Sequence, residues 1–272
     1  MPELPEVETL RKYLEATSLH QKITRFTAAD AKRQVSMPED AFRQEIMGRQ
    51  MAKTTRIGKH LLVGLDNKKV LSLHFGMTGD LHFYRLPEDA PRFERAAFWF
   101  DSGFKLAFAD SRKFGRIGLW ESVEAYVKAK TLGPDALTIT AAVLGESLRK
   151  RKSPLKPALL DQKILAGIGN WLVDEILFQA RLHPEKIAAE ITGNELQRLT
   201  EATLAVLQES VEKEAIYREL PVSYLIHARE WDDSPHAEKD AHKNCPNCQT
   251  GIVKMVVGGR ATYLCPNCQQ NK

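Results

Sequence analysis

CPNCQTGIVKMVVGGRATYLCPNC, residues 245–268, contains two CxxC pairs separated by sixteen residues, and it holds all four cysteines of the chain. Four thiolates in two close pairs suit one tetrahedral Zn²⁺ ion, because each CxxC lets two sulfurs meet the same metal. The ion would then have no open coordination position, so we expect a structural site. Its ligands are Cys245, Cys248, Cys265 and Cys268. A redox role for a CxxC is the alternative, and two pairs at this spacing disfavour it.

The chain as a whole has the composition of an ordinary globular protein with room for two moderate domains. It has 272 residues, of which 43% are hydrophobic and 27% are charged, and its formal net charge is +4. A charge this small does not identify a nucleic-acid partner, but basic residues gather at 149–156 and at Lys53, Arg56 and Lys59. Such clusters suit phosphate groups or form solvated basic faces, and charge alone leaves both open.

The N-terminal segment MPELPEVETL has no basic region followed by an apolar run, so no secretory signal is expected. No apolar stretch approaches the roughly 18 to 20 residues that a membrane helix needs. Cysteines arranged as a metal site, rather than as a disulfide framework, indicate a reducing compartment. We therefore expect a cytoplasmic protein without membrane contact, acting as a monomer.

The helical spacing of Leu4, Val7, Leu10 and Leu14 predicts a first helix over about 5–16. Short β-type runs follow, and their close spacing predicts a mostly antiparallel β-sandwich. These runs cover residues 60–65, 70–75, 81–84, 97–100 and 105–108. Residues 132–135, LGPD, suit a linker, after which the pattern is helical to about residue 219 and includes a helix over 194–214.

Pro2 is a candidate nucleophile, because removal of Met1 before a small residue would leave its secondary amine free. An α-amino group has a pKa near ~7.7–8, against ~10.4 for lysine, so a usable fraction is neutral at pH 7. Such an amine can attack a sugar carbon and form a Schiff base, and Glu3 beside it can move the protons. On this motif alone, PELPE is better explained as the start of a helix.

The turn Gly167-Ile168-Gly169-Asn170 precedes an amphipathic run over 171–180. Two glycines permit a tight turn, and Asn170 either caps the helix or offers its side-chain amide to a phosphate. Capping is the commoner role, while the basic segment just upstream favours a phosphate contact.

Together these signals belong to a set of motifs that resembles the formamidopyrimidine-DNA glycosylase and endonuclease VIII family. The motifs are PELPEVE at 2–8, LHFGMTGDL at 73–81, DSRKFG at 110–115, LGPDAL at 132–137, LKPALLDQKILAGIGNWLVDEILFQARLHPE at 155–185 and GGRATYLCPNCQ at 258–269. They span nearly the whole chain in the order of the family. The combination is therefore far more specific than any one motif.

The resemblance implies an α+β multidomain fold with three parts. Residues 1–131 would form a catalytic N-terminal β-sandwich with flanking helices. Residues 132–225 would form a helical domain with a helix–two-turns–helix motif, and residues 226–272 a lid segment and a zinc-finger β-hairpin. Double-stranded DNA containing oxidised bases or abasic sites is the implied partner, which would associate the protein with the nucleoid. No redox or nucleotide cofactor is implied.

The resemblance also assigns the residues around the reacting sugar. Pro2 matches the Schiff-base nucleophile and Glu3 its acid–base partner. Lys59 matches a catalytic-site lysine that contacts a phosphate near the lesion. Lys152 lies in a basic segment that matches a lysine near the damaged base. His74 is either a further phosphate contact or a structural histidine.

A second group of residues matches the side chains that hold the bent duplex. Met77, Arg112 and Phe114 match the residues that fill the gap left by an extruded base, and Arg112 can donate to the orphaned opposite base. Asn170 and Arg260 match residues that grip phosphates around the flipped nucleotide. Taken singly, Met77 and Phe114 are better explained as core residues and Arg112 as a surface cation.

One segment departs from the bacterial pattern, in which a longer Gly-rich loop closes over the flipped base. Here residues 226–238 read IHAREWDDSPHAE, which is short and rich in charge. This segment is more similar to the plant and fungal branch, although that branch lacks the zinc cysteines. A shortened lid predicts efficient removal of formamidopyrimidines and hydantoins and weak activity on 8-oxoguanine.

We therefore expect a base-excision repair DNA glycosylase with abasic-site lyase activity, cleaving by β/δ-elimination through a Schiff base on Pro2. One alternative is a non-catalytic binder of damaged or branched DNA on the same scaffold. Another is a zinc-ribbon protein of the translation machinery, which fits the cysteines but leaves the N-terminal motifs unexplained.

Overall fold

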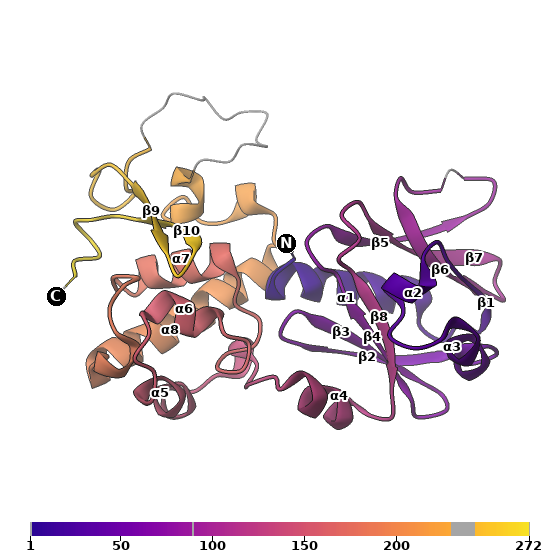
Figure 1. Cartoon of the computed structure of the whole chain (residues 1–272). Helices are drawn as coiled ribbons and strands as arrows, with labels where there is room; N and C mark the ends of the chain where they lie inside the picture. The colour runs from indigo at the N-terminus through magenta and orange to yellow at the C-terminus, as the bar shows by residue number, and fades with distance from the viewer. Residues whose placement is uncertain (1, 89, 230–242, 272) are drawn as a thin grey trace. The chain divides into compact units, whose positions relative to one another are not determined.

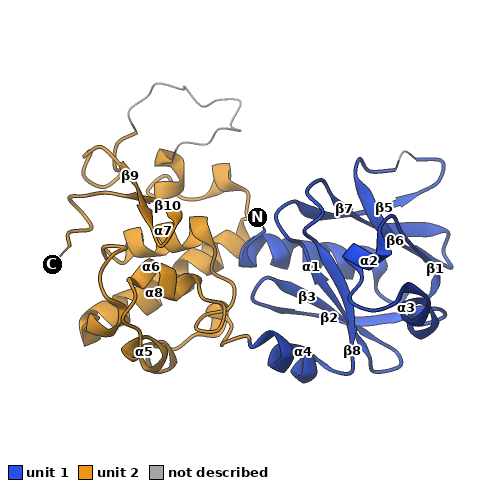
Figure 2. Ribbon diagram, in the orientation of Figure 1, with its two compact units in different colours: residues 1–131 blue, residues 132–272 orange. Residues whose placement is uncertain are grey.

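The computed structural model describes residues 2–88, 90–229 and 243–271 (Figure 1). The chain divides into two compact units, residues 1–131 and residues 132–272 (Figure 2). The expected further boundary between residues 225 and 226 stays a prediction. The larger part of the charged segment 226–238 lies outside the described residues.

The first unit contains two four-stranded antiparallel sheets. One sheet has the order β1 (Ile23–Ala28), β6 (Glu94–Phe100), β7 (Phe104–Asp110), β5 (Gly79–Arg85). The other has the order β2 (Met51–Ile57), β3 (His60–Leu65), β4 (Val70–His74), β8 (Arg116–Trp120). Short helices accompany them: α2 (Ala31–Gln34), α3 (Glu39–Ile46) and α4 (Val123–Lys130).

Alternate residues of these strands meet in one apolar core, as expected for a sandwich. Leu61 and Leu73 of the second sheet and Phe98 and Phe108 of the first belong to this core and are buried. Helix α1 (Leu4–Ser18) contacts strands β2, β3 and β5 and adds Val7 to the same core. The first helix is therefore anchored to both sheets, which fixes the position of the residues that precede it.

The second unit is mainly helical. Its elements are η1 (Ala136–Thr138), α5 (Ala141–Arg149), α6 (Leu155–Leu160), α7 (Asn170–Gln179), η2 (Ala188–Glu190), α8 (Gly193–Glu212), η3 (Tyr217–Glu219), η4 (Leu225–Ala228) and the hairpin β9 (Val253–Val257) and β10 (Arg260–Leu264). Helix α6, the turns over 161–169 and helix α7 form a helix–two-turns–helix arrangement. Helix α7 packs on α6, α8 and β10, so it is the centre of the unit.

The expected α+β fold with a sandwich, a helical part and a hairpin is confirmed, with local differences. Strands β1, β2 and β8 were not expected. Charged or exposed residues hide the alternation in β1 and β2, and β8 is a five-residue segment, RIGLW, with a glycine at its centre. Asn170 does not cap helix α7, since Gly169 occupies the N-cap position and Asn170 is the first helical residue. Among the described residues, none of the helices combines the length and apolar composition of a membrane span.

Candidate functional site

The start of helix α1 holds the expected nucleophile and its neighbour. Glu3 occupies the N-cap position and is only 3% exposed. It forms a capping box with Glu6, in which the Glu3 backbone N–H donates to Glu6 Oε2 at 3.0 Å and the Glu6 N–H donates to the Glu3 side chain. This exchange satisfies two amides that a helix start leaves open. Pro2 is thereby followed by a carboxylate in a fixed position.

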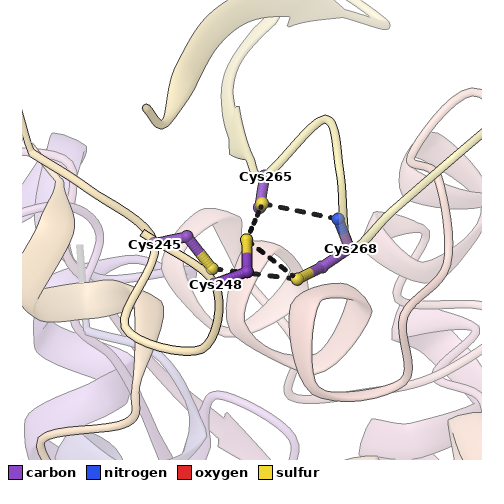
Figure 3. Close-up of side chains that lie close together, drawn as sticks. All are labelled: Cys245, Cys248, Cys265 and Cys268. Carbon is purple, nitrogen blue, oxygen red and sulfur yellow. Dashed lines mark hydrogen bonds between the residues drawn. The ribbon is translucent and has the colours of Figure 1, made fainter. Parts of the chain in front are cut away.

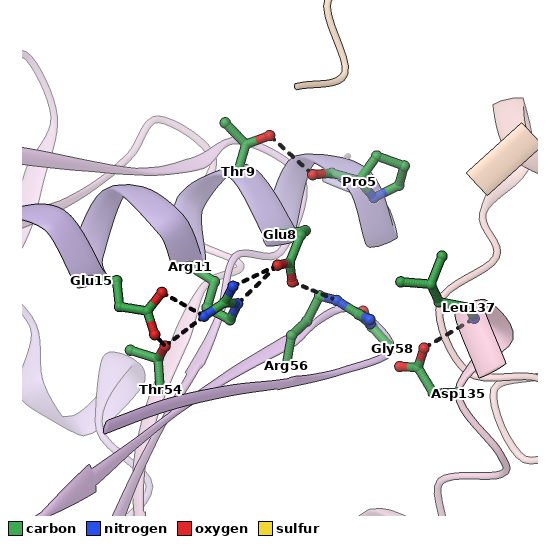
Figure 4. Close-up of polar contacts among 10 residues, drawn as sticks. All are labelled: Pro5, Glu8, Thr9, Arg11, Glu15, Thr54, Arg56, Gly58, Asp135 and Leu137. Atoms are coloured by element: carbon green, nitrogen blue, oxygen red, sulfur yellow. Dashed lines mark hydrogen bonds and ion pairs between the residues drawn. The ribbon is translucent and has the colours of Figure 1, made fainter. Parts of the chain in front are cut away.

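An ion-pair network connects α1 to the turn that carries Lys59 (Figure 4). Glu8 of the helix accepts from Arg56 Nε at 3.1 Å, and Arg56 Nη1 donates to the carbonyl oxygen of Gly58 at 3.0 Å. Arg11 also donates to Glu8. Gly58 and Lys59 form the two-residue turn between β2 and β3, and Gly58 has a left-handed φ of 58°. The Lys59 side chain is therefore held on a fixed turn and is 9% exposed.

Two histidines lie next to this turn. His60 pairs with His74 across β3 and β4, and their ring centroids are 4.9 Å apart. Tyr126 Oη is 2.6 Å from His60 Nδ1. Burial, followed by the proximity of His74 and Lys130, lowers the pKa of His60 to about 3. The pKa of His74 is also lowered, chiefly by burial.

His74 is oriented by its own loop. Its Nδ1 accepts the backbone N–H of Gly76 at 3.2 Å, so the neutral ring carries its proton on Nε2. The two histidines line a cavity of about 190 Å³ together with Ser36, Ser72, Arg116, Ile117, Gly118, Trp120, Tyr126 and Lys130. A neutral ring that donates from Nε2 can bind an anionic oxygen without the cost of holding a buried charge.

The three residues expected at the gap come together on two adjoining loops. Met77 is 38% exposed and Phe114 is 44% exposed, and the Arg112 guanidinium lies 5.5 Å from the Phe114 ring centroid. The loops touch closely: a Cβ at Gly76, whose φ is 58°, would lie 2.7 Å from the backbone of Phe114. Neither Met77 nor Phe114 is a core residue, which excludes the alternative explanation of these two side chains.

Asp110 holds the second of these loops in place. Its carboxylate accepts the backbone N–H of Gly115 at 2.7 Å and that of Arg112 at 3.1 Å. Burial by itself would raise the pKa of Asp110, but hydrogen bonds from Thr78, Gly115 and Arg112 hold the pKa below its usual value. The carboxylate is therefore charged and saturated with donors, and it fixes the loop backbone.

In the second unit, Asn170 is hydrogen-bonded to Ala261, the residue after Arg260. Asn170 Nδ2 donates to the carbonyl oxygen of Ala261 at 3.0 Å, which leaves the second amide hydrogen available. The hairpin turn has positive φ at Gly258, where a Cβ would lie 2.5 Å from Pro157. The β9–β10 hairpin therefore packs against the helix–two-turns–helix motif. Lys152 is exposed in the connection between α5 and α6.

A fully buried lysine, which the sequence alone did not single out, completes this arrangement. Lys156 Nζ donates to Asp174 Oδ1 at 2.7 Å, to the Ala261 carbonyl oxygen at 2.9 Å and to Thr262 Oγ1 at 2.8 Å. Nearby, buried Glu175 accepts the backbone N–H groups at the start of η4, and burial raises its pKa to about 7. In the sequence, the two adjacent acids within the apolar run WLVDEILF are the signal that could have indicated these buried polar contacts.

The four cysteines converge on one point (Figure 3). Their sulfurs all lie within 4.8 Å of one another, and the shorter Sγ–Sγ distances are 3.5, 3.6 and 3.8 Å. A tetrahedron with Zn–S bonds of about 2.3 Å has S–S edges of about 3.8 Å, whereas a disulfide is about 2.05 Å long. Burial and the neighbouring thiols raise the pKa of Cys268, so four thiolates need a cation between them. The donor set therefore fits Zn²⁺.

Three family models match the chain. They are the formamidopyrimidine-DNA glycosylase N-terminal domain over residues 1–117, the H2TH domain over 132–220, and the zinc finger found in FPG and IleRS over 243–271. The chain belongs to the formamidopyrimidine-DNA glycosylase family. The zinc finger match and the sulfur geometry together establish one structural zinc ion in this family member.

Curated relatives match over their full length. The formamidopyrimidine-DNA glycosylase of Pelotomaculum thermopropionicum is 36% identical over 276 residues and covers 100% of both chains. That of Chloroflexus aurantiacus is 34% identical over 274 residues and covers 99% of this chain and 98% of its own. Membership of this family at full length makes the chain a DNA glycosylase of base-excision repair.

Solved structures show the same fold. The Lactococcus lactis enzyme, non-covalently bound to DNA containing an abasic site, superposes with a TM-score of 0.87 at 29% identity, covering 99% of this chain and all of that one. MutM in complex with DNA containing carbocyclic 8-oxo-G gives the same TM-score, identity and coverage.

The low pKa of His60 predicts that this glycosylase loses stability in acid. The unfolded chain binds the proton below about pH 6.5, whereas the folded protein binds it only near pH 3. The contribution of His60 to the free energy of unfolding is therefore complete above pH 6.5. It is lost as the pH falls toward 3, and the loss is at most about 3–5 kcal/mol. Thermal unfolding of His60→Gln between pH 7.5 and 4 should be less pH-dependent than that of the wild type. His82→Gln, at a side chain that is 44% exposed, is the matched control. Parallel profiles for His60→Gln and wild type would contradict this explanation.

The metal geometry predicts one zinc per chain and a hairpin that depends on it. The cluster beneath the hairpin is small, formed chiefly by Phe178, Leu225, Tyr263 and two of the cysteines, so the metal supplies much of its folding free energy. Cys265→Ser, or removal of zinc by a chelator, should abolish hydrogen-exchange protection of the β9–β10 amides while those of α1 and the sandwich persist. Unchanged protection of the hairpin in a metal-free protein would refute the zinc requirement.

Proposed function

We propose that this glycosylase removes oxidised bases from duplex DNA and then cleaves the abasic strand through a Schiff base on the amine of Pro2. The observation that carries the proposal is the position of Pro2 next to Glu3, a nearly buried carboxylate fixed at the start of α1. The structurally similar enzymes support damaged DNA as the partner, since their solved structures contain DNA with an abasic site or a Fapy-dG lesion.

The chemistry follows from these two residues. The Pro2 nitrogen attacks C1′ of the sugar, the bond from C1′ to the base breaks, and the base leaves with a proton. Glu3 takes the proton that the Pro2 nitrogen loses and passes it to the ring oxygen of the sugar. The C1′–O bond then breaks, which opens the ring and gives an iminium ion. Loss of a C2′ proton expels the 3′ phosphate, a second elimination expels the 5′ phosphate, and water releases Pro2.

Two groups beside the turn would hold the phosphate of the damaged nucleotide. Lys59 supplies a cation from the β2–β3 turn, and His74 supplies the Nε2–H that its bond to Gly76 leaves available. Phosphate contacts of this kind position a duplex without reading its sequence. Lys152, exposed after α5, is proposed to approach the damaged base itself.

Met77, Arg112 and Phe114 are proposed to enter the duplex where the damaged base leaves it. Flipping a base costs a few kcal/mol, and apolar side chains that stack in the vacated space offset that cost. Met77 and Phe114 are exposed on adjoining loops fixed by Asp110. Arg112, over the Phe114 ring, has donors for the orphaned base. In the second unit, the free amide hydrogen of Asn170 and the guanidinium of Arg260 are proposed to grip the backbone.

Blocking the Pro2 amine should separate catalysis from binding. Pro2→Gly, or a tag left on the N-terminus, should abolish borohydride-trapped protein–DNA adducts and lower base excision by orders of magnitude. Binding to abasic DNA should survive in both proteins, because the other contacts remain. The matched control carries the same tag at its C-terminus and should trap fully. Undiminished trapping in the N-terminally tagged protein would point to an internal lysine such as Lys59, and a wild type that binds but never traps would favour the non-catalytic alternative.

The lesion preference is proposed from the short charged segment over residues 226–238. 8-oxoguanine differs little from guanine, so its selection needs donors and acceptors that enclose the flipped base. Formamidopyrimidines and hydantoins are non-planar or poorly stacked, so they flip at lower cost. We therefore propose efficient removal of these lesions and weak removal of 8-oxoguanine opposite cytosine.

Single-turnover rates on matched duplexes test this preference. Each duplex carries one formamidopyrimidine, hydantoin or 8-oxoguanine in the same sequence, and a preformed abasic site serves as the control for the lyase step. The excision rate for 8-oxoguanine should be the lowest of the panel. If 8-oxoguanine is excised as fast as the hydantoins, the short segment does not set the specificity.

A further inference from the structure

Phe93, in the connection between β5 and β6, has an unusual backbone and an unusual exposure. Its φ is 67°, in the left-handed region, and its side chain is 41% exposed. For a bulky residue this conformation carries a steric cost. Burial of the ring does not offset that cost, because much of the ring faces solvent. Strain that the surrounding contacts maintain is common at binding sites and at catalytic sites.

Contacts with the gap-filling loop hold Phe93 in this conformation. The backbone N–H of Asp110 donates to the Phe93 carbonyl oxygen at 3.0 Å. Arg95 Nε donates to the Asp110 carbonyl oxygen at 2.7 Å, and its Nη2 reaches the Ser111 carbonyl oxygen at 3.5 Å. Asp110 is also the residue whose carboxylate fixes Arg112. The Phe93 backbone is therefore bound to the same support as the proposed gap-filling side chains.

Two cationic groups lie against the Phe93 ring. The guanidinium carbons of Arg92 and Arg95 lie 4.6 and 5.5 Å from the Phe93 ring centroid. The nearby carboxylate of Glu94 is occupied, because Tyr84 Oη donates to it at 2.6 Å and Lys105 Nζ at 3.2 Å. An exposed aromatic ring between guanidinium groups is the combination with which proteins stack on nucleobases while neutralising phosphates.

We propose that Phe93, with Arg92 beside it, is a second stacking platform, which receives an unstacked nucleobase of the undamaged strand next to the gap. The inference rests on the proposed function, since it takes Arg112 on the adjoining loop to face the orphaned base of that strand. A phosphate contact alone would need only the arginines and would not require an exposed ring in a strained conformation. The ring therefore indicates a base as the ligand.

Substitution of Phe93 by glycine provides a clean test, because glycine adopts a left-handed φ without strain. Phe93→Gly should fold at least as stably as the wild type. Its affinity for a duplex with a tetrahydrofuran abasic analogue should fall about 5- to 100-fold, the loss expected for one stacked base. Phe93→Trp should retain the affinity. Leu86→Ala, which truncates another exposed side chain of the same connection, is the matched control and should bind as the wild type does.

A fluorescent base reports the contact directly. With 2-aminopurine next to the orphaned base in the undamaged strand, the wild type and Phe93→Trp should change its fluorescence on binding more than Phe93→Gly does, because the gap-filling side chains remain in all three. Wild-type affinity and fluorescence in Phe93→Gly would overturn the proposal, as would an equal loss of affinity in Leu86→Ala. Borohydride trapping through Pro2 is measured separately: its absence in the wild type would contradict the proposed function, whereas normal trapping with an unaffected Phe93→Gly would contradict the platform alone.

Discussion

The second unit depends on one buried ammonium group. Lys156 is 0% exposed, and a charge removed from water at this depth costs several kcal/mol unless it is paired and hydrogen-bonded. An ammonium has three N–H donors, and three acceptors surround it: a carboxylate of α7, a backbone carbonyl and a hydroxyl of β10. The bonds are useful because of what they join. They hold the zinc hairpin to the helix–two-turns–helix motif, and the Ala261 carbonyl oxygen in this set also accepts from Asn170.

The first unit uses the same principle with the opposite charge. Asp110 is 1% exposed, and its carboxylate is saturated by backbone amides of the loop that presents Arg112 and Phe114. In both units a buried charged group supports exposed side chains that are candidates for DNA contact. Removing one partner of such a set leaves an uncompensated buried charge, which costs about 3–5 kcal/mol. We therefore expect substitutions at these buried positions to affect folding as well as the proposed DNA contacts, and substitutions at the exposed tips to affect the proposed contacts alone.

The sequence predicted the parts of the fold whose signals are local. The zinc ligands follow from spacing, and β3 and β4 follow from apolar runs that are buried. It did not predict β2, where Lys53 and Arg56 formed part of a basic cluster that suits either phosphates or a solvated face. Lys53 is exposed, but the Arg56 side chain is only 7% exposed. In fact Arg56 pairs with Glu8 and supports the Lys59 turn. It also could not distinguish Lys156 from the other cations of residues 149–156, because burial depends on partners that lie 18 and 106 residues away.

Rigid support of exposed groups has an energetic reason under the proposed function, in which these groups help to unstack a base. Flipping costs a few kcal/mol, and a wedge offsets this only if little of its stacking energy is lost in ordering the wedge itself. A loop backbone fixed in advance by Asp110, and a helix start fixed by the Glu3–Glu6 capping box, have already lost their freedom on folding. The hydrophobic core supplies the free energy for that ordering. In the proposed mechanism the exposed side chains lose only their rotamer freedom when DNA binds, which leaves most of the stacking energy for extruding the base.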